Sequence, residues 1–456
     1  MAGILASIPT ETTMPSIRLS LILALAATTA VHAQQPSLLD IYRDLHANPE
    51  LSHYEARTSA ILAAALRSAG YTVTERVGKY PDGSQAYGVV AIMKNGPGPT
   101  LLVRADMDAL PIIEETGLPY ASHVMTKTKS GQDTGVMQAC GHDIHTTVLI
   151  GTARALAAAK AQWHGTLMLI GQPSEETIDG AKAMLADRLY ERFGRPDRII
   201  GLHDTNTLEA GKVGIHAGPA MASSTSIDVT IKGIGGHGAY PQLGRDPIAL
   251  AALYITQIQT IVSREEDPQD PAVITVGSIH GGTKRNIIPD EVKLELTARA
   301  FSARSRETII TGLQQMAAGI TTSANLPPEK AATVKILEDE STPVQSNDPA
   351  LTAQVKATLI KALGAANVVD AEKLMASEDV GVFGLASFDP FHTPQQPDIP
   401  VVYFRLGAMD PAKLSTARAA GKELPGMHTS RFEPLPEPTI QTGTTAMTAT
   451  AISLLQ

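Results

Sequence analysis

The chain has 456 residues, of which 43% are hydrophobic and 18% charged, and its formal net charge is −9 at pH 7. This composition is typical of folded globular proteins rather than disordered chains, and the length allows two domains with large cores. The negative charge, the lack of a long basic run and an aromatic content of only 4% argue against nucleic acid as a partner.

A short apolar run near the N-terminus predicts a signal peptide. Arg18 precedes the hydrophobic residues 19–27, and small residues follow up to the sequence VHA at 31–33. This is the order of a secretory signal, and the run is too short to be a stable membrane anchor. Residues 1–33 are therefore expected to be removed. The mature protein is expected to be periplasmic or secreted, without a membrane as partner.

The first part of the chain alternates helices and strands, which is typical of an α/β fold. Pro49 divides residues 38–67 into two helical segments, and another helix is expected from about residue 146 to residue 159. Strands are expected at residues 89–93, 100–103, 166–170 and 198–202.

Reactive side chains follow three of these strands. Asp106 and Asp108 come after the second strand, Glu175 and Glu176 after the third, and His203 after the fourth. The carboxyl ends of strands carry the ligand-binding groups of α/β folds. Taken singly, the aspartates could form a solvated turn and the glutamates an acidic pair at a helix N-terminus. Together they predict a site in which one glutamate binds a metal and its neighbour takes a proton from water.

The segment ACGHDIHT at residues 139–146 contains the only cysteine of the chain. Cys140 and His142 stand on either side of Gly141, which lets the backbone bend, so the thiolate and the imidazole can face the same point. The alternative is a buried structural cysteine followed by helix-capping histidines. The density of potential ligands favours a metal site. Because a single cysteine cannot form an internal disulfide, metal binding also gives a reason for a thiol in an exported protein.

From about residue 218 the pattern indicates a second, smaller domain. Its elements have the order β-α-β-β-α-β, which is that of a ferredoxin-like domain, at residues 226–232, 247–264, 272–279, 292–301, 305–322 and 332–337. The predicted organisation is a catalytic domain formed by residues 34–217 and 339–456, with the inserted domain at 218–338. The exposed edge or helices of this insert could pair with a second copy.

After the insert the chain is predicted to return to the first domain. Helices are expected at 350–363 and 443–454, a strand at 401–406, and a helical segment that opens at the sequence SED, residues 377–379. Residues 387–400 are rich in proline and predict a loop.

Eight short motifs follow one another along the chain. They are RADMDALPI (104–112), ACGHDIHT (139–146), GQPSEE (171–176), GLHD (201–204), GGHGAYP (235–241), NIIPDEV (286–292), SED (377–379) and HTSRF (428–432). In this order they resemble the M20 metallopeptidase and amidohydrolase family, from about residue 38 to the C-terminus. The most similar branch contains hippurate hydrolases, N-acyl-amino-acid amidohydrolases and auxin-conjugate hydrolases. The resemblance implies a mixed-sheet α/β catalytic domain with an inserted ferredoxin-like α+β domain that acts as lid and dimerisation domain.

The resemblance also implies a set of metal ligands, namely Cys140, His142, Glu176, His203 and His428. Five protein ligands suit two divalent ions when a ligand or a water bridges them, and in this branch the cysteine lies between the ions. Zinc or manganese is expected. Cobalt and nickel are alternatives, because sulfur and imidazole favour zinc whereas histidine-rich sites also hold the other metals.

Further roles are implied at matching positions. Glu175 matches the general base, and Asp108 an aspartate that orients a metal ligand. His237 matches a histidine that reaches the active site of a partner subunit and stabilises the oxyanion. Asn286 and Arg299 match residues that hold the carboxylate of the substrate. A homodimer or a higher homo-oligomer is therefore expected.

Some motif residues and loops depart from this pattern or have no assigned role. Asp106 stands where other branches carry a metal-binding histidine, so it is a weaker candidate ligand. Asp143 and His145 are not expected to bind metal directly. The predicted loops 387–400 and 410–425 look longer than is usual in the family, and both precede His428, so they could reshape the substrate pocket.

The sequence thus predicts an exported, two-metal amidohydrolase that cleaves the amide bond of N-acyl amino acids such as hippurate. A metallo-carboxypeptidase or dipeptidase that uses the same groups on a short peptide is the alternative enzyme. A non-catalytic metal- or ligand-binding protein on the same fold is a third alternative. That reading predicts the loss of metal ligands or of the base, whereas every matching position is filled here.

Overall fold

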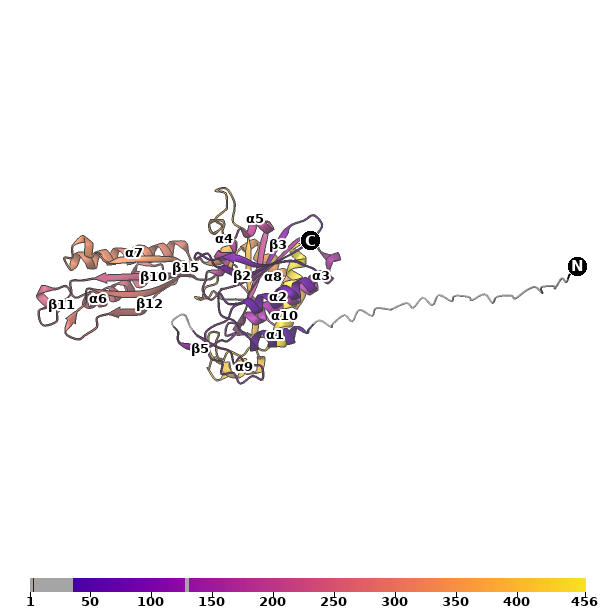
Figure 1. Cartoon of the computed structure of the whole chain (residues 1–456), viewed down its shortest axis with the longest axis horizontal. Coiled ribbons are helices and arrows are strands. Elements are labelled where there is room, and N and C mark those ends of the chain that lie inside the picture. Colours follow the sequence, from indigo (N-terminus) through magenta and orange to yellow (C-terminus); the bar gives the residue numbers. More distant parts are fainter. Residues whose placement is uncertain (1–2, 4–35, 128–130) are drawn as a thin grey trace. The chain divides into compact units, whose positions relative to one another are not determined.

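The computed structural model describes residue 3, residues 36–127 and residues 131–456. The predicted signal peptide, residues 1–33, lies outside this described part except for Gly3, so it stays a prediction. From Ser37 onwards the chain forms one compact unit, which contains one large and one smaller sheet (Figure 1). Within the described ranges, no helix combines the length and the hydropathy that a membrane span requires.

The large sheet is mixed and has eight strands. In spatial order they are β1 (Thr72–Lys79), β2 (Gln85–Asn95), β6 (Gly165–Gln172), β3 (Thr100–Asp106), β7 (Arg198–Glu209), β18 (Val401–Met409), β8 (Val213–Ile215) and β17 (Val368–Asp370). Strand β3 is parallel to both β6 and β7, and β7 is parallel to β18. Their carboxyl ends therefore meet at one edge of the sheet, as the predicted α/β fold requires.

Helices cover both faces of this sheet. The larger core contains residues of α1 (Leu38–Ala47), α2 (Ala56–Ser68), α3 (His142–Ala158), α8 (Pro349–Leu363) and α10 (Pro436–Leu454). The core on the other face contains residues of α4 (Gly180–Ala186), α5 (Leu189–Phe193) and the 3₁₀ turn Val380–Phe383. In β3, Leu101 and Val103 belong to the first core and Leu102 to the second. Burial on both faces explains why these strands are almost continuously apolar.

The smaller sheet has the predicted β-α-β-β-α-β order. Its elements are β10 (Ser223–Lys232), α6 (Pro247–Thr260), β12 (Ala272–Gly281), β14 (Glu291–Ala300), α7 (Ala303–Ser323) and β15 (Thr333–Thr342). The strands lie antiparallel in the order β12-β14-β10-β15, and both helices pack on one face. Short pairs complete the fold: β9 (Gly218–Met221) with β16 (Gln345–Asn347), β11 (Gly236–His237) with β13 (Ile287–Ile288), and β4 (Met125–Lys127) with β5 (Asp133–Gly135).

Several predicted boundaries differ from the structure, and three of them concern the site or its neighbouring helices. The helix predicted from residue 146 begins at His142, because the left-handed turn at Gly141 starts it earlier. The strand predicted at 198–202 continues to Glu209, so His203 lies inside a strand and not at its end. The last helix begins at Pro436 rather than at Gly443, since proline is well suited to a first helical turn.

Several short elements were not predicted, and the longest of them are strand β1 and a helix within residues 410–425. Strand β1 lies at the edge of the large sheet and is mostly partly exposed, so its sequence lacks a strong apolar signal. Residues 410–425, predicted as a loop, contain helix α9 (Pro411–Ala419). The side chain of Asp410 caps this helix by accepting hydrogen bonds from the backbone N–H groups of Ala412 and Lys413, a start signal that Asp-Pro provides.

Candidate metal centre

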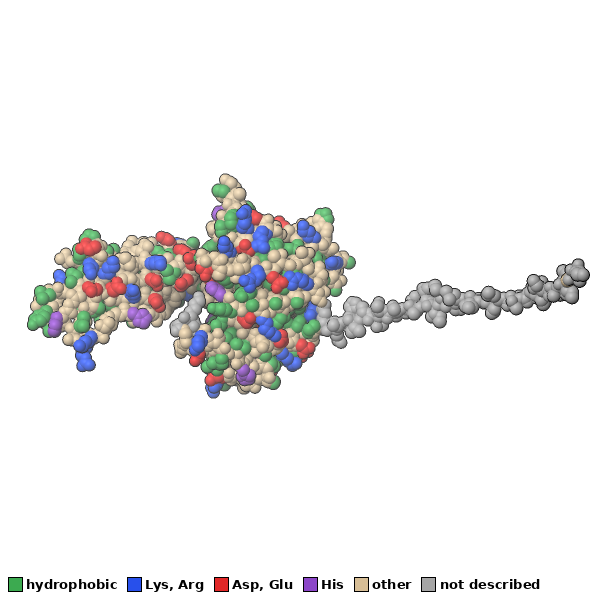
Figure 2. Space-filling model, viewed as in Figure 1, with side chains coloured by type: hydrophobic (Ala, Val, Ile, Leu, Met, Phe, Trp, Pro, Cys, Tyr) green, Lys and Arg blue, Asp and Glu red, His purple; other side chains and the backbone are tan. Residues whose placement is uncertain are grey.

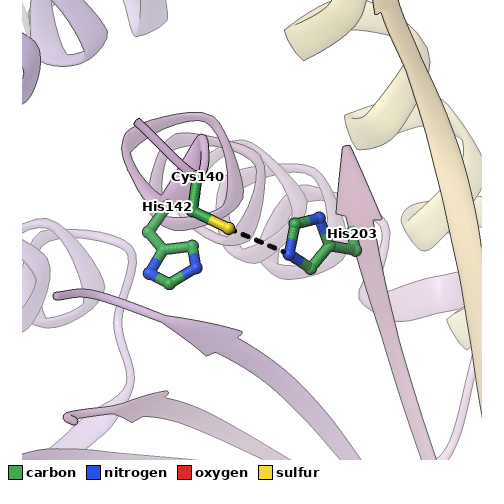
Figure 3. Close-up of side chains that lie close together, drawn as sticks. All are labelled: Cys140, His142 and His203. Carbon is green, nitrogen blue, oxygen red and sulfur yellow. Dashed lines mark hydrogen bonds between the residues drawn. The ribbon is translucent and has the colours of Figure 1, made fainter. Parts of the chain in front are cut away.

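The turn between Met137 and α3 brings a thiol into a group of imidazoles. Gly141 has φ 78°, and a side chain at this position would collide with the carboxylate of Asp204. The Sγ atom of Cys140 lies 3.5 Å from Nε2 of His203 and 3.2 Å from Nε2 of His428. Figure 3 shows Cys140, His142 and His203 turned toward one another, and one ligand atom from each lies within 4.8 Å of the others.

Backbone carbonyls select the tautomers of two of these histidines. Nδ1 of His142 lies 2.8 Å from the carbonyl oxygen of Asp108, and Nδ1 of His203 lies 2.8 Å from that of Asp204. Because a carbonyl can only accept, both Nδ1 atoms carry a proton, so in the neutral imidazole the lone pair lies on Nε2. Nε2 of His142 is buried and has no hydrogen-bond partner among the described residues. This arrangement is typical of metal-binding histidines.

Two carboxylates face the same group. The carboxylate of Asp108 accepts hydrogen bonds from the backbone N–H of Glu175 at 3.1 Å and of Glu176 at 3.0 Å, which fixes the loop after β6. Glu176 Oε2 lies 3.5 Å from Nε2 of His428. Its Oε1 is buried without a hydrogen-bond partner in the part of the chain that the structure describes. Glu175 Oε2 lies 3.9 Å from Nε2 of His142.

The raised pKa values of the acidic groups in this cluster indicate that a bound cation would stabilise their charged forms. Burial and the carboxylates of Glu378 and Glu176 raise the pKa of Glu175 well above its usual range. Burial raises the pKa of Glu176 to about 7, and burial together with Glu176 raises the pKa of the Cys140 thiol. Crowded anions in a low dielectric are costly unless a cation neutralises them. The cluster therefore fits the predicted divalent ions, because it offers sulfur, imidazole and carboxylate donors. Two of these donors, Nε2 of His142 and Oε1 of Glu176, are buried without a hydrogen-bond partner among the described residues.

The cluster opens into a pocket of about 340 Å³. Cys140, Glu175, Glu176, His203 and His428 form one part of its lining, and apolar side chains form another, namely Ile178, Ala220, Met221, Leu374 and Met427. Arg299, although it stands on β14 of the smaller sheet, also lines this pocket and donates a hydrogen bond to Oγ of Ser377 at 2.8 Å. The structure thus brings the predicted base, metal ligands and Arg299 together.

His237 and Asn286 lie elsewhere in the single chain. They stand in an exposed part of the inserted domain, where β11 and β13 form a separate two-stranded sheet. They are neighbours, since the backbone N–H of Gly238 donates to the carbonyl of Asn286 at 2.9 Å. Neither residue lines the pocket.

Asp106, Asp143 and His145, the remaining polar residues of the motifs, form hydrogen bonds with residues around the cluster. Asp106 accepts from Arg104 at 2.6 Å and lies 2.5 Å from Nδ1 of His145, so both of its oxygens are engaged. His145 is buried and also contacts Asp204. Asp143 lies 2.7 Å from Nδ1 of the buried His46. Each of these side chains therefore has a polar partner that is not part of the predicted ligand set.

A buried cation behind the site was missed by the sequence reasoning. Arg104 is fully buried, and its Nη2 lies 2.8 Å from Oε1 of Glu378 and 2.9 Å from Oδ1 of Asp379. Tyr403 donates to Glu378 at 2.7 Å. These contacts tie the SED motif, which adjoins the pocket, to β3. The available signal was an arginine inside the apolar strand TLLVRAD, because such a residue needs buried anions.

Known proteins share both the sequence and the fold. Residues 102–399 match the model of peptidase family M20/M25/M40. Hippurate hydrolase of Campylobacter jejuni subsp. jejuni serotype O:2 is 36% identical over 357 residues, which cover 76% of this chain and 87% of that protein. N-acetyl-L-cysteine deacetylase of Bacillus subtilis is 36% identical over 356 residues, which cover 76% of this chain and 78% of that protein.

A solved structure extends the similarity to nearly the whole chain. The YXEP protein of Bacillus subtilis, described as a dinuclear metal binding peptidase from the M20 family, superposes with a TM-score of 0.70 at 27% identity. The match covers 92% of this chain and 97% of that one. The resemblance predicted from the eight motifs is confirmed, and the chain belongs to peptidase family M20/M25/M40 as a metal-dependent hydrolase.

Proposed function

We propose that the protein is an amidohydrolase that cleaves the amide bond of N-acyl amino acids, with Glu175 as general base. One observation carries this proposal: two adjacent carboxylates, those of Glu175 and Glu176, stand beside sulfur and imidazole donors in a small pocket. Relatives named hippurate hydrolase and N-acetyl-L-cysteine deacetylase support the substrate class, since hippurate and N-acetyl-L-cysteine are both N-acyl amino acids.

Two divalent metal ions would be held by Cys140, His142, Glu176, His203 and His428. When bound, such ions lower the pKa of water and polarise a carbonyl group. Zinc or manganese suits these donors, with cobalt and nickel as alternatives.

The protein's own groups then position and move protons. Glu175, whose backbone N–H is held by Asp108, would accept a proton from the attacking water and pass it to the leaving amine nitrogen. Arg299 would bind the carboxylate of the amino acid through a charge-assisted hydrogen bond. The apolar lining at Ile178, Met221 and Leu374 would receive the acyl group.

A metallo-carboxypeptidase or dipeptidase with the same site is the second candidate. A dipeptide would place a free ammonium group where an N-acyl amino acid places an apolar acyl group. The apolar side chains of the pocket favour the acyl group, because an ammonium ion placed against them would lose its hydration.

Hydrolysis of a substrate panel tests the proposal. We expect the protein, loaded with zinc or manganese, to release amino acid from hippurate or an N-acetyl amino acid faster than from dipeptides. Elemental analysis should find about two metal ions per chain. Faster turnover of dipeptides would favour the peptidase. A full metal content without turnover of any panel member would contradict the proposed substrate class.

Export is proposed on the basis of residues 1–33 alone. The expected mature protein begins near Gln34, and N-terminal sequencing of protein recovered from the periplasm or the medium measures this directly. An intact N-terminus in the recovered protein would refute cleavage.

We also propose a dimer in which His237 and Asn286 complete the site of the partner subunit. Large hydrophobic side chains are exposed near these residues, namely Ile234, Tyr240, Leu243, Ile248, Leu253 and Ile287. Figure 2 shows hydrophobic side chains at the end of the inserted domain where Figure 1 labels β11 and α6. Exposed apolar groups of this kind mark protein interfaces.

Mixed dimers test this arrangement. Co-expression of His237→Ala and Glu175→Gln chains should restore roughly a quarter of wild-type activity, because half of the dimers are mixed and each has one intact site. Each variant alone should be nearly inactive. If His237 acts within its own chain, co-expression will give no recovery.

A further inference from the structure

The pocket contains two arginines that do not form ion pairs. Arg299 and Arg405 both line it. Arg299 donates to the hydroxyl of Ser377 at 2.8 Å, and Arg405 donates to the backbone carbonyl of Glu372. Both acceptors are neutral. Within the described residues, neither guanidinium has a carboxylate at ion-pair distance, in contrast to the guanidinium of Arg104.

Both arginines are partly withdrawn from water. Burial lowers the pKa of Arg299 and of Arg405, and for Arg405 the more distant charge of Glu372 opposes this effect only in part. A guanidinium offers five donors in a planar fork that matches a carboxylate. Removing such a group from water without an anion costs free energy. Each arginine is therefore a binding group for an anion that enters the pocket.

Arg405 stands next to the candidate metal centre. On β18 it is the register partner of His203 on the parallel strand β7. Register partners on neighbouring strands lie about 4.8 Å apart and project from the same face of the sheet. Arg405 and His203 also line the same pocket, so we infer that a group bound by Arg405 shares that pocket with the amide that is to be cleaved.

The two arginines reach the pocket from different places. Arg299 is anchored at Ser377 and Arg405 at Glu372. Between these anchors, Leu374 bridges to Met221, and both side chains line the pocket. A single carboxylate is not expected to satisfy both guanidinium groups across this apolar stretch. The pocket is thus suited to two carboxylates joined by a short apolar chain.

We propose that the preferred substrates are N-acyl amino acids that carry a second carboxylate, and that Arg405 binds this second group. The inference rests on the proposed function, because Arg299 is taken to hold the α-carboxylate. The second carboxylate can belong to the amino-acid side chain or to the acyl chain. Arg405 would then determine specificity without taking part in proton transfer.

Two pairs of matched substrates separate these sources. N-acetyl-L-glutamate against N-acetyl-L-glutamine probes the side chain, and N-succinyl-L-alanine against its terminal amide probes the acyl chain. For at least one pair we expect kcat/KM to favour the charged member by roughly 10- to 100-fold, the range of one charge-assisted hydrogen-bonded pair. Arg405→Gln should bring this ratio close to one, and Arg405→Lys, which keeps the charge, should give an intermediate ratio.

Two controls distinguish a loss of substrate specificity from a general effect of the substitution on folding. Arg418→Gln, at an exposed arginine of α9, should keep the wild-type ratio, and circular dichroism checks that each variant is folded. The wild-type ratios are a test that needs no variant. Ratios near one for both pairs, with turnover of the neutral members, would overturn this inference and leave the proposed function intact.

Two other outcomes also decide the question. A preference for the charged member that persists in Arg405→Gln would overturn the assignment to Arg405. If no substrate is turned over, which counts against the proposed function, calorimetry measures the affinity of the metal-loaded wild type and Arg405→Gln for the same pairs. Equal affinity for charged and neutral members would then overturn the second carboxylate site.

Discussion

Replacing Glu175 with glutamine is expected to lower kcat for N-acyl amino acids by roughly 10²- to 10⁴-fold, the contribution typical of a positioned general base. Glutamine has nearly the same shape and keeps the backbone N–H that donates to Asp108, but its amide cannot accept the proton of water. Because Glu175 is not among the proposed ligands, the metal content should stay at the wild-type level. Steady-state kinetics and elemental analysis of the same preparation measure both quantities.

Glu176→Gln is the matched comparison, since it changes the neighbouring carboxylate in the same way. Glu176 lies 3.5 Å from His428 and is a proposed ligand, so this variant should lose metal as well as activity. The two proposed roles would be wrong if Glu175→Gln lost metal and Glu176→Gln kept it. Glu175→Gln with more than about a tenth of wild-type kcat would exclude Glu175 as the base.

Replacing Arg104 with methionine is expected to lower the free energy of unfolding by about 3–5 kcal/mol, the cost of removing one partner from a buried ion pair. Asp106, Glu378 and Asp379 would then be buried together without their shared cation. Burial already raises the pKa of Asp379 to about 8 despite the opposing charge of Arg104. Denaturant unfolding followed by circular dichroism measures the change.

Arg67→Met is the matched control for this prediction. Arg67 pairs with Glu75 at 2.5 Å, but the two side chains are 49% and 34% exposed, and ion pairs at the surface contribute less than about 1 kcal/mol. A loss of similar size in both variants would show that the buried cluster has no special role. A loss below about 1 kcal/mol in Arg104→Met would mean that the three carboxyl groups are accommodated without their cation.

The positions of the candidate base and of part of the candidate metal cluster could be predicted because their geometry is local. The spacing of Cys140 and His142 around Gly141 is enough to place both groups at one turn, and the structure has that turn with φ 78°. The change from apolar to acidic residues after residue 170 likewise locates Glu175 and Glu176 beyond a buried strand. The alternation in 292–301 predicted β14, because one face of that strand is buried and the other exposed.

The roles of Arg104, of the SED motif and of Arg405 were harder to predict, because the residues that they contact are distant in sequence. Arg104 and the SED motif are separated by more than 270 positions, and nothing local reveals that they form one buried ion cluster. Arg405 likewise lies in a strand without any local signal of a role. Its position next to His203 follows only from the pairing of β18 with β7. Which strands become neighbours depends on how two apolar faces are buried at once, and a local pattern does not encode that choice.

The sequence by itself thus determined the family, the α/β class with its ferredoxin-like insert, and the candidate ligands and base. These features depend on short-range spacing, periodicity and motif order. Only the tertiary structure decided that His428, 288 positions from Cys140, lies 3.2 Å from its sulfur, and that backbone carbonyls select the tautomers of His142 and His203. It also decided that Arg405 lies beside His203, because long-range contacts arise from the packing of the whole sheet.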